Sequence, residues 1–249
     1  MYGRRPVLEA LRAGVEVRRL FVARGTKPLG ALKEILDRAT AGRVPVQWVA
    51  REALDRQARH HQGVAAEVAA FAFVDVDEIL AQAAERNEPP LVVVLDSIQD
   101  VQNLGQLIRT AEAVGAHGII LPEHRSAGVT PAVRKTSAGA VAHMAIARVT
   151  NLARTLDQLK RRDVWVAGLD MAGQDVYNGV DLTMPLALVV GSEGRGLARL
   201  TRQKCDLLVR LPMRGKVASL NAAVAASVVL YEVLRQRAAR GGDDAVVAQ

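Results

Sequence analysis

The chain has 249 residues, half of them hydrophobic, which allows one large domain or two modest ones with a packed core and excludes an overall disordered chain. Basic residues outnumber acidic ones by 33 to 26, and a net charge of +7 favours a polyanionic partner. Aromatic residues make up only 3%, which leaves little material for a base-stacking sheet of the RRM kind. A solvated surface in an arginine-rich proteome would explain the same charge.

The rarer residues narrow the class of protein further. One cysteine, Cys205, excludes an internal disulfide and suits a reducing compartment. The histidines are scattered, and because no spacing resembles a zinc site we expect no metal. No apolar run approaches the roughly 20 residues that a membrane span needs, and the first residues do not form a signal peptide. We therefore expect a soluble cytoplasmic protein with no membrane partner.

Residues 1–75 have the pattern of a small basic domain. Residues 2–11 begin a short helix, with Pro6 in its first turn, and the patterns that follow predict strands and helices in turn. The predicted strands are 17–22, 44–49 and 64–74, and the predicted helices are 30–41 and 51–59. Residues 1–74 hold 13 basic and seven acidic side chains, so most of the net charge lies in under a third of the chain. This concentration favours RNA binding, with Arg4 and Arg5 among the expected contacts.

A change of composition follows this domain. Residues 75–84 predict a short helix that the charged residues and proline pair at 85–90 cannot continue, so we predict a linker over residues 76–90. Continuous apolar runs then alternate with helical patterns, which is typical of a parallel α/β sheet covered on both faces. The predicted strands are 91–95, 118–121, 164–169, 186–190 and 207–211, and the predicted helices are 104–115, 151–162 and 220–238. We expect this second domain to span residues 91–240 and the tail at 241–249 to be frayed.

The segment after the first of these strands carries two candidate site residues. Asn103 precedes an apolar helical stripe, and Gln106 follows three residues later, a spacing that suits a helix N-cap. That structural role is the alternative to a role of Asn103 in a site. Arg109 lies off the apolar stripe, one turn after Gly105. For Arg109, the alternative to a functional role is a surface ion pair with Glu112.

Residues 125–140 form a second candidate segment, rich in small residues and cations. Compact side chains would allow an RNA backbone to approach while Arg134 and Lys135 contact its phosphates. A solvated loop followed by the start of a helix would have the same composition.

The stretch 186–235 contains the strongest site pattern. A strand runs into Gly191-Ser-Glu-Gly-Arg-Gly196, where glycine lets the backbone turn and a ligand approach the main chain. Ser219 and Asn221 stand at the start of the last predicted helix, where free amide hydrogens point outward. Together these segments predict a pocket. Because the Walker A, Rossmann and Gly-x-Ser-x-Gly patterns are all missing, an NTPase, an NAD enzyme and a charge-relay hydrolase are unsupported.

Three motifs, in this order, resemble those of the SpoU (TrmH-type) RNA ribose 2′-O-methyltransferases, over residues 91–237. They are Asn103-x-Gly-x-x-x-Arg109-Thr-Ala, Val190-Gly-Ser-Glu-Gly-x-Gly196 and Leu211-Pro-Met-x-Gly-x-Val-x-Ser-Leu-Asn221. The first 75 residues, with Gly3-Arg-x-Pro-Val-Leu-Glu-Ala-Leu11, are similar to the substrate-binding domain of the bacterial 23S rRNA guanosine-2′-O-methyltransferase branch. The segment from Arg148 to Thr155 points to the same branch.

The resemblance implies a SPOUT fold: a parallel α/β domain with a C-terminal trefoil knot, working as a homodimer. An L30e/L7Ae-like RNA-binding domain would precede it. The knot follows from the resemblance alone, since chains almost never thread their own loops. The resemblance also implies S-adenosylmethionine bound bent in the knot, against the loops that begin at Gly191, Leu211 and Leu220. Gly196 and Met213 would belong to the same cofactor site.

By resemblance, Arg109 is the base, or the group that steers the proton, when a ribose 2′-hydroxyl attacks the sulfonium methyl. A guanidinium stays protonated at neutral pH, so substrate phosphate, desolvation or simple polarisation of the hydroxyl would have to assist it. Asn103 and Glu193 are expected to position Arg109 and the ribose. Ser219 and Asn221 are expected to shape the pocket at the start of the helix.

The expected function is S-adenosylmethionine-dependent 2′-O-methylation of a guanosine ribose in 23S rRNA, in ribosome maturation. Two alternatives lie within the family. One is 2′-O-methylation of a tRNA, and the other is 2′-O-methylation of an rRNA adenosine that confers antibiotic resistance. A non-catalytic RNA-binding ribosome-assembly factor is an alternative of another class, and the intact motif residues argue against it. A small-molecule methyltransferase is disfavoured by the basic first domain.

Overall fold

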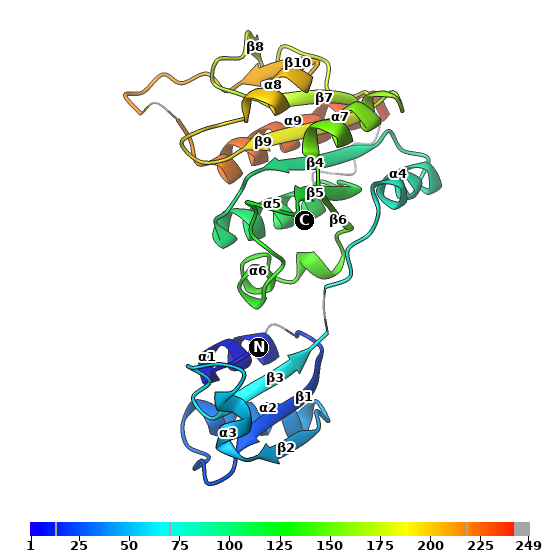
Figure 1. The fold of residues 1–249 in the computed structure, drawn as a ribbon. Coiled ribbons are helices and arrows are strands. Elements are labelled where there is room, and N and C mark those ends of the chain that lie inside the picture. The colour runs from blue at the N-terminus through cyan, green and yellow to red at the C-terminus, as the bar shows by residue number, and fades with distance from the viewer. Residues whose placement is uncertain (13, 70, 218, 242–249) are drawn as a thin grey trace. The chain divides into compact units, whose positions relative to one another are not determined.

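The computed structural model describes residues 1–12, 14–69, 71–217 and 219–241, so the predicted frayed tail lies, apart from Gly241, outside the described residues. The chain forms two compact units (Figure 1). The first comprises Met1–Ala72 and Val129–Lys135, and the second comprises Phe73–Gly128 and the chain from Thr136 onward.

The first unit is a three-stranded sheet covered by helices on both faces. Its elements are α1 (Arg4–Arg12), β1 (Val17–Ala23), α2 (Ala31–Ala41), β2 (Val46–Val49), α3 (Arg51–Asp55) and β3 (Val64–Val68). The order is β2-β1-β3, with β1 parallel to β2 and antiparallel to β3. Leu20 and Val22 alternate along β1 and pack with α1 and α2, whereas Leu54 of α3 packs on the other face. The predicted strand to residue 74 and helix to residue 59 are both too long.

The second unit is built on a seven-stranded sheet of order β6-β5-β4-β9-β7-β10-β8, in which every pair is parallel. Its first elements are α4 (Val76–Glu85), β4 (Leu91–Asp96), α5 (Val101–Ala113), β5 (Gly118–Pro122), a 3₁₀ turn (Ala140–Ala142) and β6 (Ile146–Val149). The rest are α7 (Leu152–Lys160), β7 (Trp165–Leu169), β8 (Asp175–Val176), β9 (Leu186–Gly191), α8 (Arg199–Lys204), β10 (Leu207–Arg210) and α9 (Ala222–Gly241). Helix α6 (Pro131–Thr136) follows β5 in the sequence, but all of it except Thr136 belongs to the first unit.

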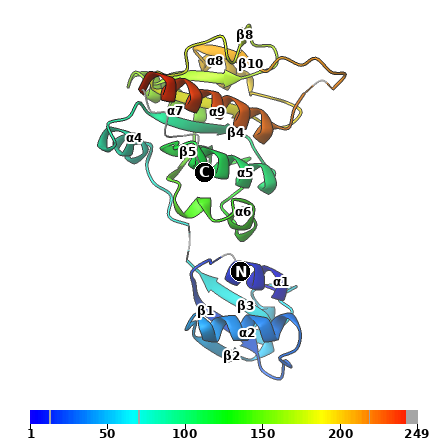
Figure 2. The same ribbon diagram turned by 180° about the vertical axis from the view of Figure 1, so that it is seen from behind.

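Helices cover both faces of this sheet. Helices α7 and α8 lie in front of it in Figure 1, and α5 and α9 lie in front of it in Figure 2, which shows the molecule from behind. Val92 and Val94 of β4 belong to the core cluster on the α7 side, while the intervening Val93 and Leu95 are fully buried too. The continuous apolar runs therefore correspond to strands buried on both faces, and the predicted parallel α/β fold class is confirmed.

The segment 76–90 differs from the predicted linker. The short helix predicted over 75–84 is confirmed as α4, residues 76–85, which begins with a capping box between Asp75 and Glu78. Ile79 of this helix is fully buried in the core of the second unit and packs so closely on Gly118 that a Cβ there would overlap it. The change of composition predicted a linker between the two domains. In the structure the apolar side of α4 packs on the sheet, so these residues are part of the second unit.

The carboxyl edge of the sheet positions the candidate site. Strands β4 and β9 are neighbours, in register from Leu91↔Leu186 to Asp96↔Gly191. The chain moves from β4 to β5 and β6 on one side and then crosses to β7, beyond β9. Open α/β sheets bind ligands outside the carboxyl ends of the strands where the strand order reverses in this way. We therefore expect a site where β4, β9 and β7 end.

We predict that His117 makes the protein less stable in mild acid. Its buried Nδ1 accepts a hydrogen bond from Leu91 N at 3.0 Å, and its Nε2 lies 3.1 Å from Glu88 Oε2. Burial lowers the pKa of His117 below its ordinary value of 6.5, so the unfolded chain takes up the proton first as the pH falls. The free energy of unfolding should therefore decrease below pH 6.5, by at most about 1.4 kcal/mol per pH unit.

Urea denaturation at about pH 7.5 and about pH 5.5 measures this effect. His117→Gln is the control, because it removes the titrating imidazole and should flatten the pH dependence. The same loss of stability in both proteins would contradict the assignment.

Candidate active site

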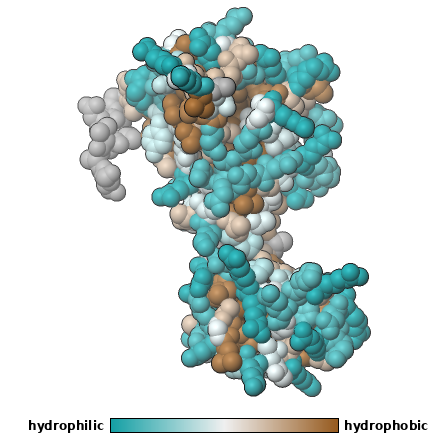
Figure 3. Space-filling model, turned by 90° about the vertical axis from the view of Figure 1, so that its left-hand side faces the viewer, coloured by the Kyte–Doolittle hydropathy of each residue, from teal (hydrophilic) through white to brown (hydrophobic). Residues whose placement is uncertain are grey.

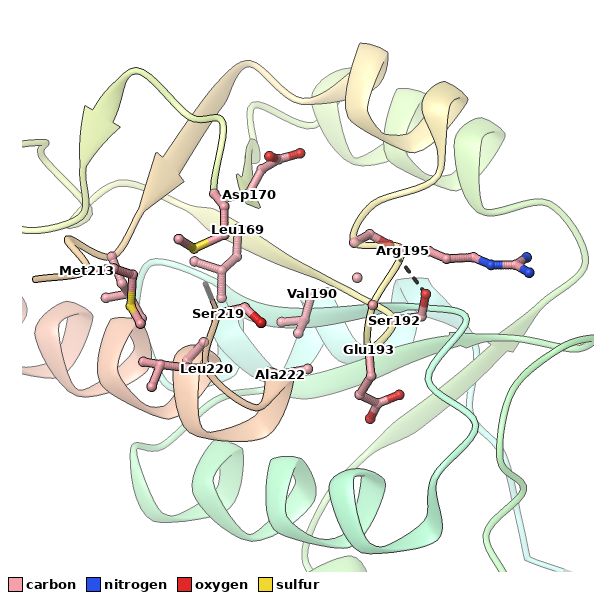
Figure 4. Close-up of a pocket in the computed structure, with 16 residues that line it drawn as sticks. Leu169, Asp170, Val190, Ser192, Glu193, Arg195, Met213, Ser219, Leu220 and Ala222 are labelled. Carbon is pink, nitrogen blue, oxygen red and sulfur yellow. Dashed lines mark hydrogen bonds between the residues drawn. The ribbon is translucent and has the colours of Figure 1, made fainter. Parts of the chain in front are cut away.

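A cavity of about 300 Å³ lies at the carboxyl edge of the sheet (Figure 4). The ends of β7 and β9, the loop after β10 and the start of α9 enclose it. Its wall is largely apolar, and Asp170 and Glu193 add two carboxylates. The apolar side chains include Leu169, Val190, Leu211, Met213 and Leu220. An apolar cavity of this size with a few polar groups has the character of a small-molecule site.

The loop after β9 is held in one conformation. Ser192 N donates to Gly196 O at 3.1 Å, and Gly196 N donates back to Ser192 O at 2.9 Å. A Cβ at Gly191 would overlap the backbone of Gly196, so only glycine fits there. At the far end of the loop, the buried carboxylate of Asp96 accepts a hydrogen bond from Ala198 N at 2.7 Å. The loop is therefore preformed as one wall of the cavity.

Asn103 joins the three candidate motifs. Its Nδ2 donates to Glu193 Oε1, and its Oδ1 accepts from Asn221 Nδ2 at 2.8 Å. The three side chains come from α5, the glycine loop and the residue before α9. Asn103 is only 4% exposed, and a buried amide needs both of its polar groups paired. Three of the predicted catalytic residues therefore form one hydrogen-bonded set.

The alternative reading of Asn103 as a helix N-cap is wrong. Helix α5 begins at Val101, earlier than predicted, and its N-cap is Asp100, whose side chain accepts from Gln102 N at 2.9 Å. Asn103 lies inside the first turn. Its side chain is therefore free to bond to the glycine loop, because another residue already caps the helix.

Asn221 serves α9 as well as Asn103. Its Oδ1 accepts from Ala223 N at 2.9 Å and from Val224 N at 3.2 Å, which satisfies two amides at the helix start. Ser219, two residues earlier, lines the cavity. The five residues predicted to bind the cofactor line it too, namely Gly191, Gly196, Leu211, Met213 and Leu220.

Arg109 is not brought to this cavity. It is exposed on α5 and does not line the cavity. Among the described residues it forms no ion pair, so the alternative pairing with Glu112 is wrong.

The predicted RNA contacts lie on α1 and α6 and are not among the residues that line the cavity. Arg4 donates from N and Nε to Gln62, at 3.2 Å in both cases, whereas Arg5 is exposed. The Arg134 guanidinium carbon lies 5.8 Å from the centre of the Phe71 ring. Lys135 Nζ lies 2.9 Å from Glu9 Oε2. Their role in RNA binding stays a prediction.

Sequence reasoning missed the wall that β7 contributes. Leu169, Asp170 and Met171 follow one another at the end of this strand and line the cavity. Asp170 is fixed there, since its Oδ1 accepts from Ala172 N at 2.8 Å and its Oδ2 lies 3.2 Å from Arg202 Nε. The sequence contained the information needed to predict this wall. A parallel strand predicted at 164–169 must end at the same edge of the sheet as its neighbouring strand.

Beyond the cavity, the described residues offer few reactive groups. Burial raises the pKa of Cys205 to about 12, so its thiol is inert near neutral pH. Within the described ranges, no group of three or more His, Cys, Asp or Glu could hold a metal ion. None of the helices in that part of the chain is both long and apolar enough to cross a membrane.

Residues 90–231 match the SpoU rRNA methylase family, which is more than half of the chain. The chain belongs to the SpoU rRNA methylase family. Residues 1–74 of this SpoU protein match a second family, described as RNA 2′-O ribose methyltransferase substrate binding. The enzyme class that the three motifs implied, an RNA methyltransferase, is confirmed.

Two relatives are similar over most of this chain. The protein is 45% identical over 236 residues to YacO of Bacillus subtilis, named as a TrmH family tRNA/rRNA methyltransferase, with 94% of each chain covered. It is 47% identical over 237 residues to an uncharacterized tRNA/rRNA methyltransferase of Mycobacterium tuberculosis, covering 94% of this chain and 73% of the relative.

Solved structures agree with the fold. The SpoU methyltransferase AviRb of Streptomyces viridochromogenes, in complex with AdoMet, is 30% identical with a TM-score of 0.66, covering 96% of this chain and 90% of AviRb. An AdoMet-bound rRNA methyltransferase of Sinorhizobium meliloti is 26% identical with a TM-score of 0.62. The similarity covers 94% of this chain and 86% of the Sinorhizobium meliloti chain.

Proposed function

We propose that this SpoU enzyme transfers the methyl group of S-adenosylmethionine to the 2′-oxygen of a guanosine ribose in 23S rRNA. The observation that supports this most is the hydrogen-bonded set of Asn103, Glu193 and Asn221, which joins the three family motifs beside the cavity. A non-catalytic RNA-binding factor would have no need for a polar set built on the buried Asn103 at a small-molecule cavity.

S-adenosylmethionine fits the cavity. Leu211 and Met213 offer apolar contact to an adenine ring, and the turned backbone from Gly191 to Gly196 offers polar groups without side chains in the way. The ligand carries positive charge on its sulfonium and amino groups, and the carboxylates of Asp170 and Glu193 are the opposite charges at hand. AdoMet is the bound cofactor in the structures of both AviRb and the Sinorhizobium meliloti enzyme.

When bound, S-adenosylmethionine supplies an activated methyl group. A bond forms between the ribose 2′-oxygen and the methyl carbon as the sulfur–carbon bond breaks; the electron pair leaves on sulfur and the hydroxyl proton passes to water. The chain contributes mainly orientation: Asn103 holds the Glu193 carboxylate at the cavity, where it can accept a hydrogen bond from the ribose hydroxyl. Ser219 shapes the opposite wall.

We assign the steering of that proton to Arg109. It follows Asn103 by six residues, about 9 Å along the axis of α5. Side chains on a helix lean toward its N-terminus, which for α5 is the carboxyl edge of the sheet. The exposed guanidinium can therefore extend toward an acceptor ribose once RNA phosphate lies against it.

The substrate class is supported by the first unit. It carries most of the positive net charge and matches a substrate-binding family of RNA ribose methyltransferases. The choice of 23S rRNA and of guanosine rests on the resemblance of residues 3–11 and 148–155 to that branch. An enzyme of ribosome maturation belongs in the cytoplasm, where we place it.

Transfer of labelled methyl groups to unmodified transcripts of 23S rRNA, 16S rRNA and tRNA tests the proposal. Label on 23S rRNA alone is the expected result. Label on tRNA alone would overturn the rRNA assignment, and no label on any RNA would overturn the activity.

We also propose that the enzyme is a homodimer joined through α9. Val224, Val228 and Tyr231 recur on one face of this helix and are 47%, 38% and 54% exposed. Exposed apolar surface of this kind marks interfaces, and Figure 3 shows apolar surface in the second unit framed by hydrophilic side chains. Ser227, on the same helix, is bonded to Thr110 of α5 at 2.9 Å, so α9 packs beside the helix that carries Arg109.

The double variant Val228→Glu, Tyr231→Glu should sediment as a monomer, because two charges in an apolar interface are costly to bury. Leu200→Glu on α8 is the matched control: Leu200 is 56% exposed, off the proposed interface, and its variant should stay dimeric. A dimeric double variant would contradict the interface.

A further inference from the structure

We propose that a second cavity, on the other side of the glycine loop from the cofactor cavity, receives the acceptor nucleotide, and that Arg125 and Arg195 bind its phosphates. This inference rests on the proposed function, because it names where the RNA substrate of the same reaction binds.

The second cavity has a volume of about 450 Å³ and lies between the end of β4 and the glycine loop. Its lining is mainly polar, in contrast to the apolar cofactor cavity. It includes Asp96, Ser97, Gln99, Arg125 and Arg195. A volume in the range of small-molecule sites suits a single nucleotide splayed out of an RNA strand.

The glycine loop is the partition between the two cavities. Ser192, Glu193, Arg195 and Gly196 line both of them. The loop is fixed at its far end, since Asp96 Oδ2 accepts from Ala198 N at 2.7 Å. A methyl group in one cavity and a ribose hydroxyl in the other would meet at this loop, and Glu193 is the carboxylate that faces both.

Arg195 lines both cavities, but its side chain extends away from the apolar one. Figure 4 shows its side chain directed away from Leu169, Met213 and Leu220, which gather on the other side of the loop. The guanidinium therefore points out of the apolar cavity in which we place the cofactor.

Arg125 is held at the second cavity by its backbone. The loop that carries it is tied to the end of β4 by a hydrogen bond from Ala127 N to Ile98 O at 2.8 Å. Arg125 adopts φ of 58° and Ser97 adopts φ of 65°, a left-handed conformation that residues other than glycine rarely take. Both residues line the same cavity.

The charge of the cavity favours a phosphodiester. Within the part of the chain that the structure describes, neither Arg125 nor Arg195 has an ion-pair partner, whereas the nearby Arg202 is paired with Asp170. Both oxygens of Asp96 are already bonded, to Ser97 Oγ at 3.1 Å and to Ala198 N. Glu193, the second carboxylate in the lining, accepts a hydrogen bond from Asn103 Nδ2. Two guanidinium groups without ion-pair partners, beside two carboxylates that are already hydrogen-bonded, suit the negative charge and geometry of RNA phosphates.

The test uses the variants Arg125→Ala and Arg195→Ala and measures the binding of RNA and the binding of the cofactor separately. Each variant should raise the KM for an unmodified 23S rRNA transcript about tenfold and lower the salt dependence of RNA binding by about one phosphate contact. The Kd for S-adenosylmethionine, measured by calorimetry without RNA, should not change. Arg86→Ala is the matched control, because Arg86 is an exposed arginine after α4, at the opposite edge of the sheet.

An unchanged KM in both variants, or a weakened affinity for S-adenosylmethionine, would overturn the assignment. If the unaltered enzyme methylates no RNA, the proposed function has failed. Filter binding of the same transcript then decides the cavity independently, because equal affinity of the unaltered protein and the double variant would overturn it as well.

Discussion

Arg109→Ala should bind S-adenosylmethionine with unchanged affinity and lose about 10²- to 10⁴-fold in kcat, the range of a positioned proton-transfer group. The residue lies outside the cofactor cavity, so its removal leaves that wall intact. It is exposed on α5, so truncation should cost little stability. Single-turnover methyl transfer to 23S rRNA, with calorimetric titration of the cofactor, separates the two effects.

Gln106→Ala is the matched control for Arg109, since Gln106 is an exposed side chain one turn earlier on the same helix. It should turn over normally. Arg109→Lys keeps the charge but not the planar fork, so partial activity would indicate that charge alone assists the proton. Unchanged turnover of Arg109→Ala would refute the role assigned to it.

Gly191→Ala should weaken the binding of S-adenosylmethionine by about a hundredfold, which corresponds to about 2.7 kcal/mol and is typical of overpacking. The added Cβ would overlap the backbone of Gly196, and backbone cannot rotate away as a side chain can. The hydrogen bonds between Ser192 and Gly196 would have to open, and with them one wall of the cavity. Isothermal titration of the cofactor measures the loss.

Gly194→Ala is the matched control in the same loop. No atom lies within 4 Å of a Cβ at Gly194, so the added methyl group would cause no overlap. The only cost is backbone strain, because alanine would have to adopt the φ of 79°. That strain costs about 1 kcal/mol. If Gly191→Ala bound the cofactor no worse than Gly194→Ala, the glycine loop would not be the wall that we describe.

The long buried strands could be predicted from the sequence because a strand covered on both faces needs an unbroken apolar run. Strand β4 was predicted as 91–95 and is Leu91–Asp96, and β9 was predicted as 186–190 and is Leu186–Gly191. The short β6 and β8 were not predicted, since Arg148 interrupts the apolar pattern of β6 and the two residues of β8 carry no periodicity.

The contacts between distant segments could not be predicted from spacing. Asn103 looked like an N-cap because the local pattern contains no sign of Glu193, which lies 90 residues away and accepts its hydrogen bond. The cavity wall from β7 and the second cavity at Arg125 are also formed by segments that are distant in the sequence. They were therefore identified only from the structure. The resemblance supplied the motif residues, and the fold showed that Arg109 stands apart from the others.

The most direct test of the central claim is ribose-methylation sequencing of ribosomal RNA from a strain that lacks the gene. The account predicts that one guanosine of 23S rRNA loses its 2′-O-methyl group, that the intact gene restores it and that the Arg109→Ala variant does not. An unchanged 23S rRNA profile, or a methyl group lost from a tRNA instead, would contradict it.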